Sequence, residues 1–279
     1  MKTITELTIE QYKAYLIEEE KSKATVEKYV HDVSVFAAWL GKAELCKTEV
    51  LEYKEYIRTG RAPTSVNSVL SSLNSFFAFR EQYALRVKTL KIQKQIFAKD
   101  EKELTKTEYD RLLNAAKAKS NRMLYLLMQT ICATGIRVSE LKYIDTDSVK
   151  TGRAEVNMKG KLRVIVIPPT LCKMLKKYAE NKKITGGSIF VTKKGKPLDR
   201  TNIWRMMKSL CESAGVDKKK VFPHNLRHLF ARTFYAAEKD IVRLADILGH
   251  SSVNTTRIYT MGTWEICRRQ VQKLGLLRC

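Results

Sequence analysis

Histidine, proline and long apolar segments are all scarce in this sequence of 279 residues. It contains four histidines and five prolines. No apolar run approaches the ~20 residues that a membrane-spanning helix needs. The first six residues, MKTITE, lack the apolar stretch of a signal peptide. We therefore expect a protein that neither spans a membrane nor is exported.

The cysteines also lack the spacing of a metal site or a disulfide framework. They are Cys46, Cys132, Cys172, Cys211, Cys267 and Cys279. None of them forms a CxxC pair, which structural zinc sites commonly use. The sequence therefore predicts no disulfide, no bound metal and no cofactor, and it fits a reducing cytoplasm.

Positive charge is abundant and unevenly distributed. The chain carries 52 Lys and Arg against 29 Asp and Glu, a net charge of +23. Residues 1–100 have 16 basic and 13 acidic side chains, a net of +3, so residues 101–279 carry the remaining +20. Such a charge predicts a polyanionic partner, usually nucleic acid. An acidic membrane surface or a merely solvated basic surface are the alternatives.

The first hundred residues have the apolar spacing of helices. Four patterns recur at intervals of three and four: Ile9 to Leu16, Val26 to Leu40, Val50 to Ile57, and Val66 to Phe77. Aromatic side chains within them could stack on bases, but their helical spacing favours core packing. This part therefore reads as a small helical domain.

A polar segment, residues 86–104, predicts a linker to a second domain. That domain begins with a capping-box pattern at Thr105 and Glu108. The segment 123–133 is apolar nearly all round, which indicates a buried helix that Gly135 interrupts. The expected domains are 1–100 and 105–279.

Strands are expected only in the second domain. Residues 154–158 and 162–167 predict a hairpin with lysine at its tip, and 189–191 a third strand. Helices resume from about Arg200, and Pro223 stands near the start of another. The fold class is therefore mainly α, with a helical first domain and an α+β second domain that holds a small antiparallel sheet.

Four short motifs in the second domain carry chemistry. Ala133–Leu141 reads ATGIRVSEL, residues 223–228 read PHNLRH, residues 248–250 read LGH, and Tyr259 follows nine residues after His250. Alone, each has a bland reading: a helix-start arginine, surface histidines, a helix cap, one tyrosine among twelve. A zinc site at His224 and His228 is conceivable from their spacing, but no third ligand stands nearby.

Together and in this order, the motifs resemble the tyrosine recombinase (phage integrase) family over both domains. The resemblance implies a core-binding, SAM-like first domain and a catalytic second domain. It matches the catalytic positions to Arg137, Lys159, His224, Arg227, His250 and Tyr259. Glu140 and His228 match supporting positions, and Lys161 is the alternative to Lys159. The linker lacks the prolines common in the family, and no arm-binding domain precedes the helices, as in Xer-type enzymes and compact mobile-element integrases.

These residue types suit attack on a phosphodiester. Two guanidiniums can bind the nonbridging oxygens, on which negative charge develops. The tyrosine hydroxyl has a pKa near 10 and needs a base or a cationic field, which His224 and the arginines could supply. Lysine could protonate the leaving 5′-oxygen. The resemblance implies a 3′-phosphotyrosyl intermediate, a Holliday junction and a homo-tetramer on DNA.

The resemblance leaves several functions open. Integration and excision of a mobile element is the expected one, with Xer-like dimer resolution or DNA inversion as alternatives. A non-catalytic DNA-binding relative and a type IB topoisomerase are further alternatives. A C-terminal segment, residues 264–277, is expected to dock on a neighbouring subunit through Ile266, Val271, Leu274 and Leu277.

Overall fold

A computed structural model describes residues 3–92, 103–158, 161–192, 194–259, 268–269 and 271–274. The chain divides into two compact units, Met1–Lys94 and Gln95–Cys279. The two are described separately below.

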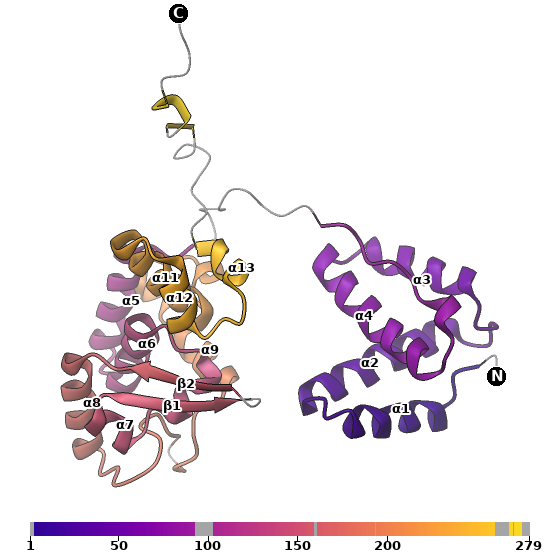
Figure 1. Ribbon diagram of the computed structural model, residues 1–279. Helices are drawn as coiled ribbons and strands as arrows, with labels where there is room; N and C mark the ends of the chain where they lie inside the picture. Colours follow the sequence, from indigo (N-terminus) through magenta and orange to yellow (C-terminus); the bar gives the residue numbers. More distant parts are fainter. Residues whose placement is uncertain are drawn as a thin grey trace, which may run out of the picture. The chain divides into compact units, whose positions relative to one another are not determined.

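Over residues 3–92 the first unit has four α-helices and a short 3-10 helix, shown in indigo to magenta in Figure 1. They are α1 (Glu6–Glu18), α2 (Lys23–Leu40), α3 (Lys47–Arg58), α4 (Pro63–Phe79) and η1 (Tyr83–Leu85). Each of the four predicted helices is confirmed. Gly41 ends α2 with a φ of 58°. The rings of Tyr12, Phe36 and Phe76 are fully buried, so these aromatics form the core, as their spacing predicts.

Both ends of the expected linker are packed. The side-chain amides of Asn74 and Asn67 exchange hydrogen bonds with the backbone of Val87 and Leu90, respectively. Val87 is buried in the core of the first unit, and Leu104 is buried in the core of the second. Residues 93–102 lie outside the described residues.

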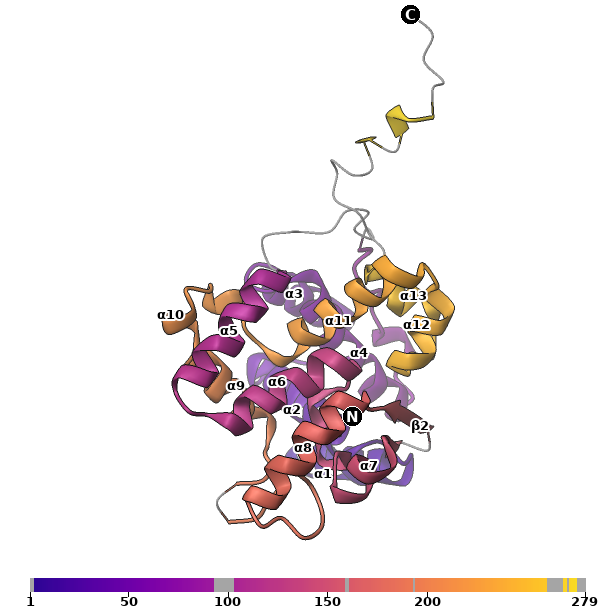
Figure 2. The ribbon, with the colours of Figure 1, turned by 90° about the vertical axis from the view of Figure 1, so that its left-hand side faces the viewer.

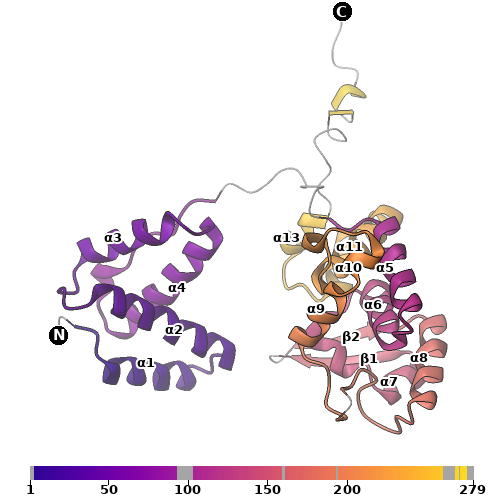
Figure 3. The ribbon, with the colours of Figure 1, turned by 180° about the vertical axis from the view of Figure 1, so that it is seen from behind.

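In the second unit, the other helices and a hairpin are arranged around the buried helix α6. Its α-helices are α5 (Lys106–Ala118), α6 (Arg122–Thr134), α7 (Thr146–Thr151), α8 (Pro169–Asn181), α9 (Arg200–Lys208), α10 (Cys211–Ala214), α11 (Pro223–Glu238), α12 (Ile241–Leu248) and α13 (Val253–Thr256). Its 3-10 helices are η3 (Val138–Tyr143), η4 (Lys218–Lys220) and η5 (Arg257–Tyr259). Figures 2 and 3 show α5 and α6 side by side, and α11 also packs against α6.

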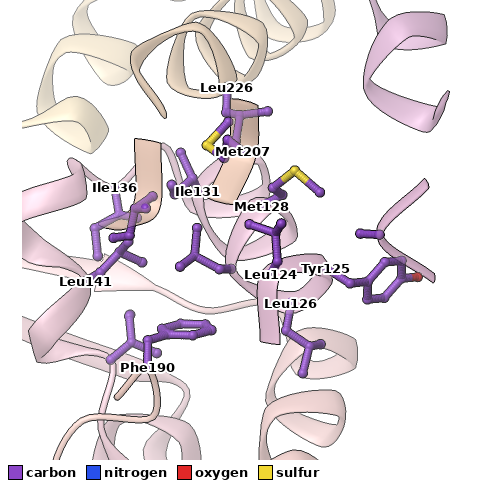
Figure 4. Packing of buried hydrophobic residues seen from close by; sticks show 14 of the residues in the cluster. Leu124, Tyr125, Leu126, Met128, Ile131, Ile136, Leu141, Phe190, Met207 and Leu226 are labelled. Carbon is purple, nitrogen blue, oxygen red and sulfur yellow. The ribbon is translucent and has the colours of Figure 1, made fainter. Parts of the chain in front are cut away.

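The apolar segment 123–133 forms most of α6 and lies in the core, as predicted. Leu124, Leu126, Leu127, Met128 and Ile131 are fully buried. They belong to one cluster with Ile136, Leu141, Phe190, Met207 and Leu226, which come from elements along the whole unit. Figure 4 shows Leu124, Leu126, Met128 and Ile131 among these side chains. The capping box at Thr105 and Glu108 starts α5, also as predicted. The helix α6 is therefore the support on which the following turn depends.

A two-stranded antiparallel sheet, β1 (Arg153–Met158) and β2 (Lys161–Val166), confirms the predicted hairpin. Ala154, Val156 and Ile165 face the core, whereas Leu162, Val164 and Val166 are exposed. The predicted third strand at 189–191 is wrong. Ser188 and Val191 form only isolated bridges, to Asp145 and Pro197, because this segment is a loop with single contacts on each side. Within the described residues, no helix is long and apolar enough to cross a membrane.

Candidate active site

A left-handed glycine directs the chain from α6 into the site. Gly135 ends α6 with a φ of 62°, a backbone conformation that side chains other than glycine rarely adopt. A Cβ at this position would lie 2.5 Å from the Phe230 ring, so the turn is also tightly packed. The turn places Arg137 at the start of η3.

Arg137 is held by Glu140, one turn further along. Nη1 of Arg137 donates to Oε1 of Glu140 at 2.9 Å, and the Arg137 backbone N–H donates to Oε2 at 2.9 Å. The Glu140 side chain is 3% exposed, whereas that of Arg137 is 39% exposed. Nη2 of Arg137 donates to the carbonyl of Gly249 at 3.1 Å. The carboxylate therefore orients a guanidinium that still reaches solvent.

Arg227 lies deeper, in the first half of α11. This helix starts at Pro223, whose fixed φ suits the first turn. Arg227 is 2% exposed, and its guanidinium donates to the carbonyls of Gly135 and Leu248, the latter at 2.7 Å. Burial, together with the charges of Arg137 and Arg163, lowers its pKa to about 10. Arg227 thus joins the end of α6 to the end of α12.

His250 is positioned as a neutral ring. Nη2 of Arg227 lies 3.0 Å from its Nε2, and Nδ1 lies 2.8 Å from Oγ1 of Thr256. Because a guanidinium only donates, Nε2 must accept, and the proton sits on Nδ1. Burial and the charges of Arg227 and Arg137 lower the His250 pKa to about 4. Both ring nitrogens are therefore occupied by protein partners in this structure.

Tyr259 is the last residue of η5, and its side chain is turned inward. The residue is 5% exposed. Its ring lies edge-on to His228, with centroids 4.9 Å apart, and parallel to His250, at 6.2 Å. Burial raises the pKa of the hydroxyl, while the charge and hydrogen bonding of Arg227 lower it. The predicted nucleophile thus lies beside one predicted phosphate-binding arginine.

His224 and His228 lie one turn apart on α11, with ring centroids 4.4 Å apart. His224 reaches solvent, but its ring is partly covered by the protein. This partial burial and the charges of Arg227 and Arg137 lower its pKa. Burial lowers the pKa of His228 further, to about 4. Among the described residues, Nε2 of His228 has no hydrogen-bond partner.

Sequence reasoning missed one member of the cluster, Arg163 of β2. Its Nη1 donates to Oε2 of Glu140 at 3.2 Å and to the carbonyl of Leu248 at 2.8 Å. Burial lowers its pKa, which Glu140 opposes. Its inward orientation is visible only once the register of the hairpin is known, so no signal in the sequence identified it.

A cleft of about 880 Å³ opens beside this cluster. Its lining includes Arg137, Glu140, Arg163, His250 and Ser251. The structure thus brings together Arg137, Glu140, His224, Arg227, His228, His250 and Tyr259, all predicted from sequence. Lys159 lies outside the described residues, so the alternative between Lys159 and Lys161 stays open. Two guanidiniums, a phenol and neutral imidazoles can bind and attack a phosphodiester.

Sequence comparison identifies the class of protein to which this fold and site belong. The profile of the phage integrase family matches residues 102–264, and that of the phage integrase N-terminal SAM-like domain matches residues 9–82. The chain therefore belongs to the phage integrase family, whose tyrosine recombinases are enzymes that cleave and rejoin DNA strands. The expected fold class and family are both confirmed.

The chain is similar to particular recombinases along nearly its whole length. It is 31% identical to tyrosine recombinase XerA of Thermococcus kodakarensis, over 96% of this chain and 95% of the relative. It is 26% identical to a XerA recombinase of known crystal structure, with a TM-score of 0.53, over 99% of this chain and 100% of the other. A lambda integrase tetramer bound to a Holliday junction shares the fold at 21% identity, with a TM-score of 0.70, over 90% of this chain and 76% of the other.

Proposed function

We propose that this chain is a site-specific DNA recombinase in which Tyr259 attacks the scissile phosphate. One observation carries the proposal: the Tyr259 ring lies against both His250 and His228, and the charge of nearby Arg227 opposes the rise in the pKa of its hydroxyl that burial causes. A guanidinium beside the phenol favours the phenolate and can bind the phosphate that the phenolate attacks.

The reaction is a transesterification that conserves the number of phosphoester bonds. The Tyr259 oxygen forms a bond to phosphorus, the bond to the 5′-oxygen breaks, and a 3′-phosphotyrosyl link results. His224 accepts the phenolic proton, and Lys159 supplies one to the leaving 5′-oxygen. Arg137, Arg227 and His250 stabilise the charge on the nonbridging oxygens. Attack by a 5′-hydroxyl of another strand reverses these steps without ATP.

His250 can donate to a phosphate only if it exchanges one of its present partners. Both nitrogens of His250 are used within the protein, and Arg227 donates to two carbonyls and to His250. A phosphate that accepts from Nη2 of Arg227 would free Nε2 of His250. The ring could then donate to the phosphate from Nε2 once it is protonated or has changed tautomer. DNA binding is therefore part of the assembly of the site.

We further propose that residues 1–100 form a core-binding domain, that residues 105–279 form the catalytic domain, and that both contact double-stranded DNA. The strong positive charge of the second part supports this division. Strand exchange through a Holliday junction requires four active sites, so we propose a homo-tetramer on DNA, as in the lambda integrase complex. The product is integration or excision of a mobile element.

Xer-like dimer resolution is the second candidate. The similarity to XerA over almost the full length of both chains favours it. Sequencing the DNA that flanks the gene separates the two: inverted repeats at the ends of a mobile segment favour integration and excision. A single site in an otherwise ordinary chromosome favours dimer resolution.

A nicked suicide substrate, which loses its short leaving strand after cleavage, tests the chemistry. The wild-type protein should give a detergent-resistant protein–DNA band, and peptide mapping should place the nucleotide on Tyr259. Tyr259→Phe removes one oxygen, so it should bind DNA and form no adduct. An adduct in Tyr259→Phe, or one mapped to Ser251, would refute the proposed mechanism.

A further inference from the structure

Arg163 is a charged residue on the inward face of the sheet. It pairs with Val156 across the hairpin, and Val156 and Ile165 on the same face are buried. The Arg163 side chain is 9% exposed. A guanidinium removed from water is costly unless it is paired, so its partners explain why the fold keeps it.

A single nitrogen of Arg163 reaches both halves of the active site. Nη1 donates to Oε2 of Glu140 at 3.2 Å and to the carbonyl of Leu248 at 2.8 Å. Glu140 also accepts from Arg137, and the Leu248 carbonyl also accepts from Arg227. Arg163 therefore shares a hydrogen-bond acceptor with each of the two phosphate-binding arginines.

The loop that carries His250 rests directly on the Arg163 side chain. Gly249 ends α12 with a φ of 62°, and a Cβ at this position would lie 2.5 Å from Cδ of Arg163. The Gly249 carbonyl accepts from Arg137. The close approach of this loop thus depends on both the missing side chain at Gly249 and the stem of Arg163.

We propose that Arg163 is a positioning residue that keeps Arg137 and Arg227 aligned for one phosphate, an inference that rests on the proposed function. Its Nε and Nη2 have no hydrogen-bond partner among the described residues, but both are buried, so neither is exposed to a ligand in the cleft, and Nη1 makes the contacts to Glu140 and Leu248. Its charge also matters. Three guanidiniums and one carboxylate leave a net charge of +2, which matches the doubly negative phosphorus centre formed during attack.

Single-turnover cleavage of the nicked suicide substrate tests this role. Arg163→Met keeps the apolar stem and removes the fork, so adduct formation should slow by about 10²-fold, the loss expected of a small misplacement of reacting groups. The Kd for DNA should stay within about threefold of the wild-type value. Arg163→Lys should recover the rate only in part, to about three- to tenfold below wild type, because an ammonium can donate to both Glu140 and Leu248 but lacks the planar fork of a guanidinium.

Arg232→Met is the matched control. Arg232 of the same unit also pairs with a glutamate, Glu103, and with a backbone carbonyl, that of Leu104, but away from the cleft. Its loss should lower stability and leave the cleavage rate within threefold of wild type. Equal slowing in the two methionine variants, or a wild-type rate in Arg163→Met, would overturn the proposal.

The other possible results also support or refute the positioning role of Arg163. If Arg163→Met does not fold, Arg163→Lys carries the test: a rate reduced three- to tenfold with unchanged DNA affinity supports positioning, and a wild-type rate or a loss beyond 10²-fold refutes it. If the wild-type protein itself forms no adduct, the proposed function fails. If only the Arg163 variants behave like wild type, the proposed function stands and this inference alone fails.

Discussion

The ring of His228 meets the ring of Tyr259 edge-on, with an interplanar angle of 89° and centroids 4.9 Å apart. Edge-to-face packing of this kind favours one orientation of the ring. Because burial lowers the pKa of His228 to about 4, its ring is neutral at physiological pH. We infer that His228 orients the phenol, whereas the exposed His224 is the histidine placed to exchange a proton.

The depressed histidine pKa values predict a loss of stability in mild acid. The pKa values of His228 and His250 are lowered to about 4, against 6.5 in an unfolded chain. Between these values the unfolded state binds more protons, so the free energy of unfolding should fall as pH drops from about 6.5 to 4. Calorimetric Tm values over this range should fall less steeply for His228→Asn than for wild type. His31→Asn, at an exposed position in the first unit, is the control, and equal slopes in all three proteins would contradict the prediction.

Replacement of Gly135 should destabilise the protein more than replacement of a comparable glycine. Gly135→Ala places a Cβ in a left-handed conformation and 2.5 Å from the Phe230 ring. We expect a loss of roughly 2–4 kcal/mol, from backbone strain plus overpacking. Gly152→Ala is the control, because it shares the positive φ but its nearest neighbour lies at 3.8 Å. Its loss should be about 1–2 kcal/mol. Urea unfolding measures both, and similar values would show that the packing against Phe230 does not matter.

Lys159 should act as the general acid, although it lies outside the described residues. Lys159→Ala should slow cleavage by about 10²–10⁴-fold, the usual range for this form of catalysis. A substrate with sulfur in place of the leaving 5′-oxygen needs no proton, so this variant should cleave it nearly as fast as wild type does. The same substrate with Lys161→Ala is the comparison. Rescue in that variant alone would assign the role to Lys161.

DNA affinity should depend steeply on salt. The net charge of +23 predicts the release of many counterions on binding, so log Kd should rise linearly with log salt concentration. Arg137→Gln should reduce the slope by about one, the effect of losing one phosphate contact. Fluorescence anisotropy with a labelled duplex, at salt concentrations from about 50 to about 200 mM, measures this slope. An affinity that does not change with salt would argue against DNA as the partner.

The sequence predicted the elements that local spacing determines. The α6 core, the end of that helix at Gly135, the capping box at Thr105 and the hairpin each depend on a few neighbouring residues. The residues of the site were predicted because their motifs are distinctive. The third strand at 189–191 was wrong, because an apolar triplet fits a buried loop as well as a strand.

Arg163 was beyond reach of the sequence for a different reason. The alternation of β2 can be read in two registers, and its apolar Leu162, Val164 and Val166 suggest that these three face the core. The structure has them exposed and turns Arg163 inward. The side of β2 that faces the core depends on the partners of Arg163, which are Glu140 and the carbonyl of Leu248, and both are distant in sequence. Long-range pairing of this kind leaves no local periodic pattern.

The end of α12 holds all three arginines at once. The carbonyls of Leu248 and Gly249 accept from Arg137, Arg163 and Arg227, at the end of the helix where the backbone dipole is negative. A tilt of this eight-residue helix would therefore move the three guanidiniums together, and no one of them could be adjusted alone. Substitutions at exposed positions of α12, such as Val242, would then change the reaction rate by moving all three arginines together rather than by altering any one of them.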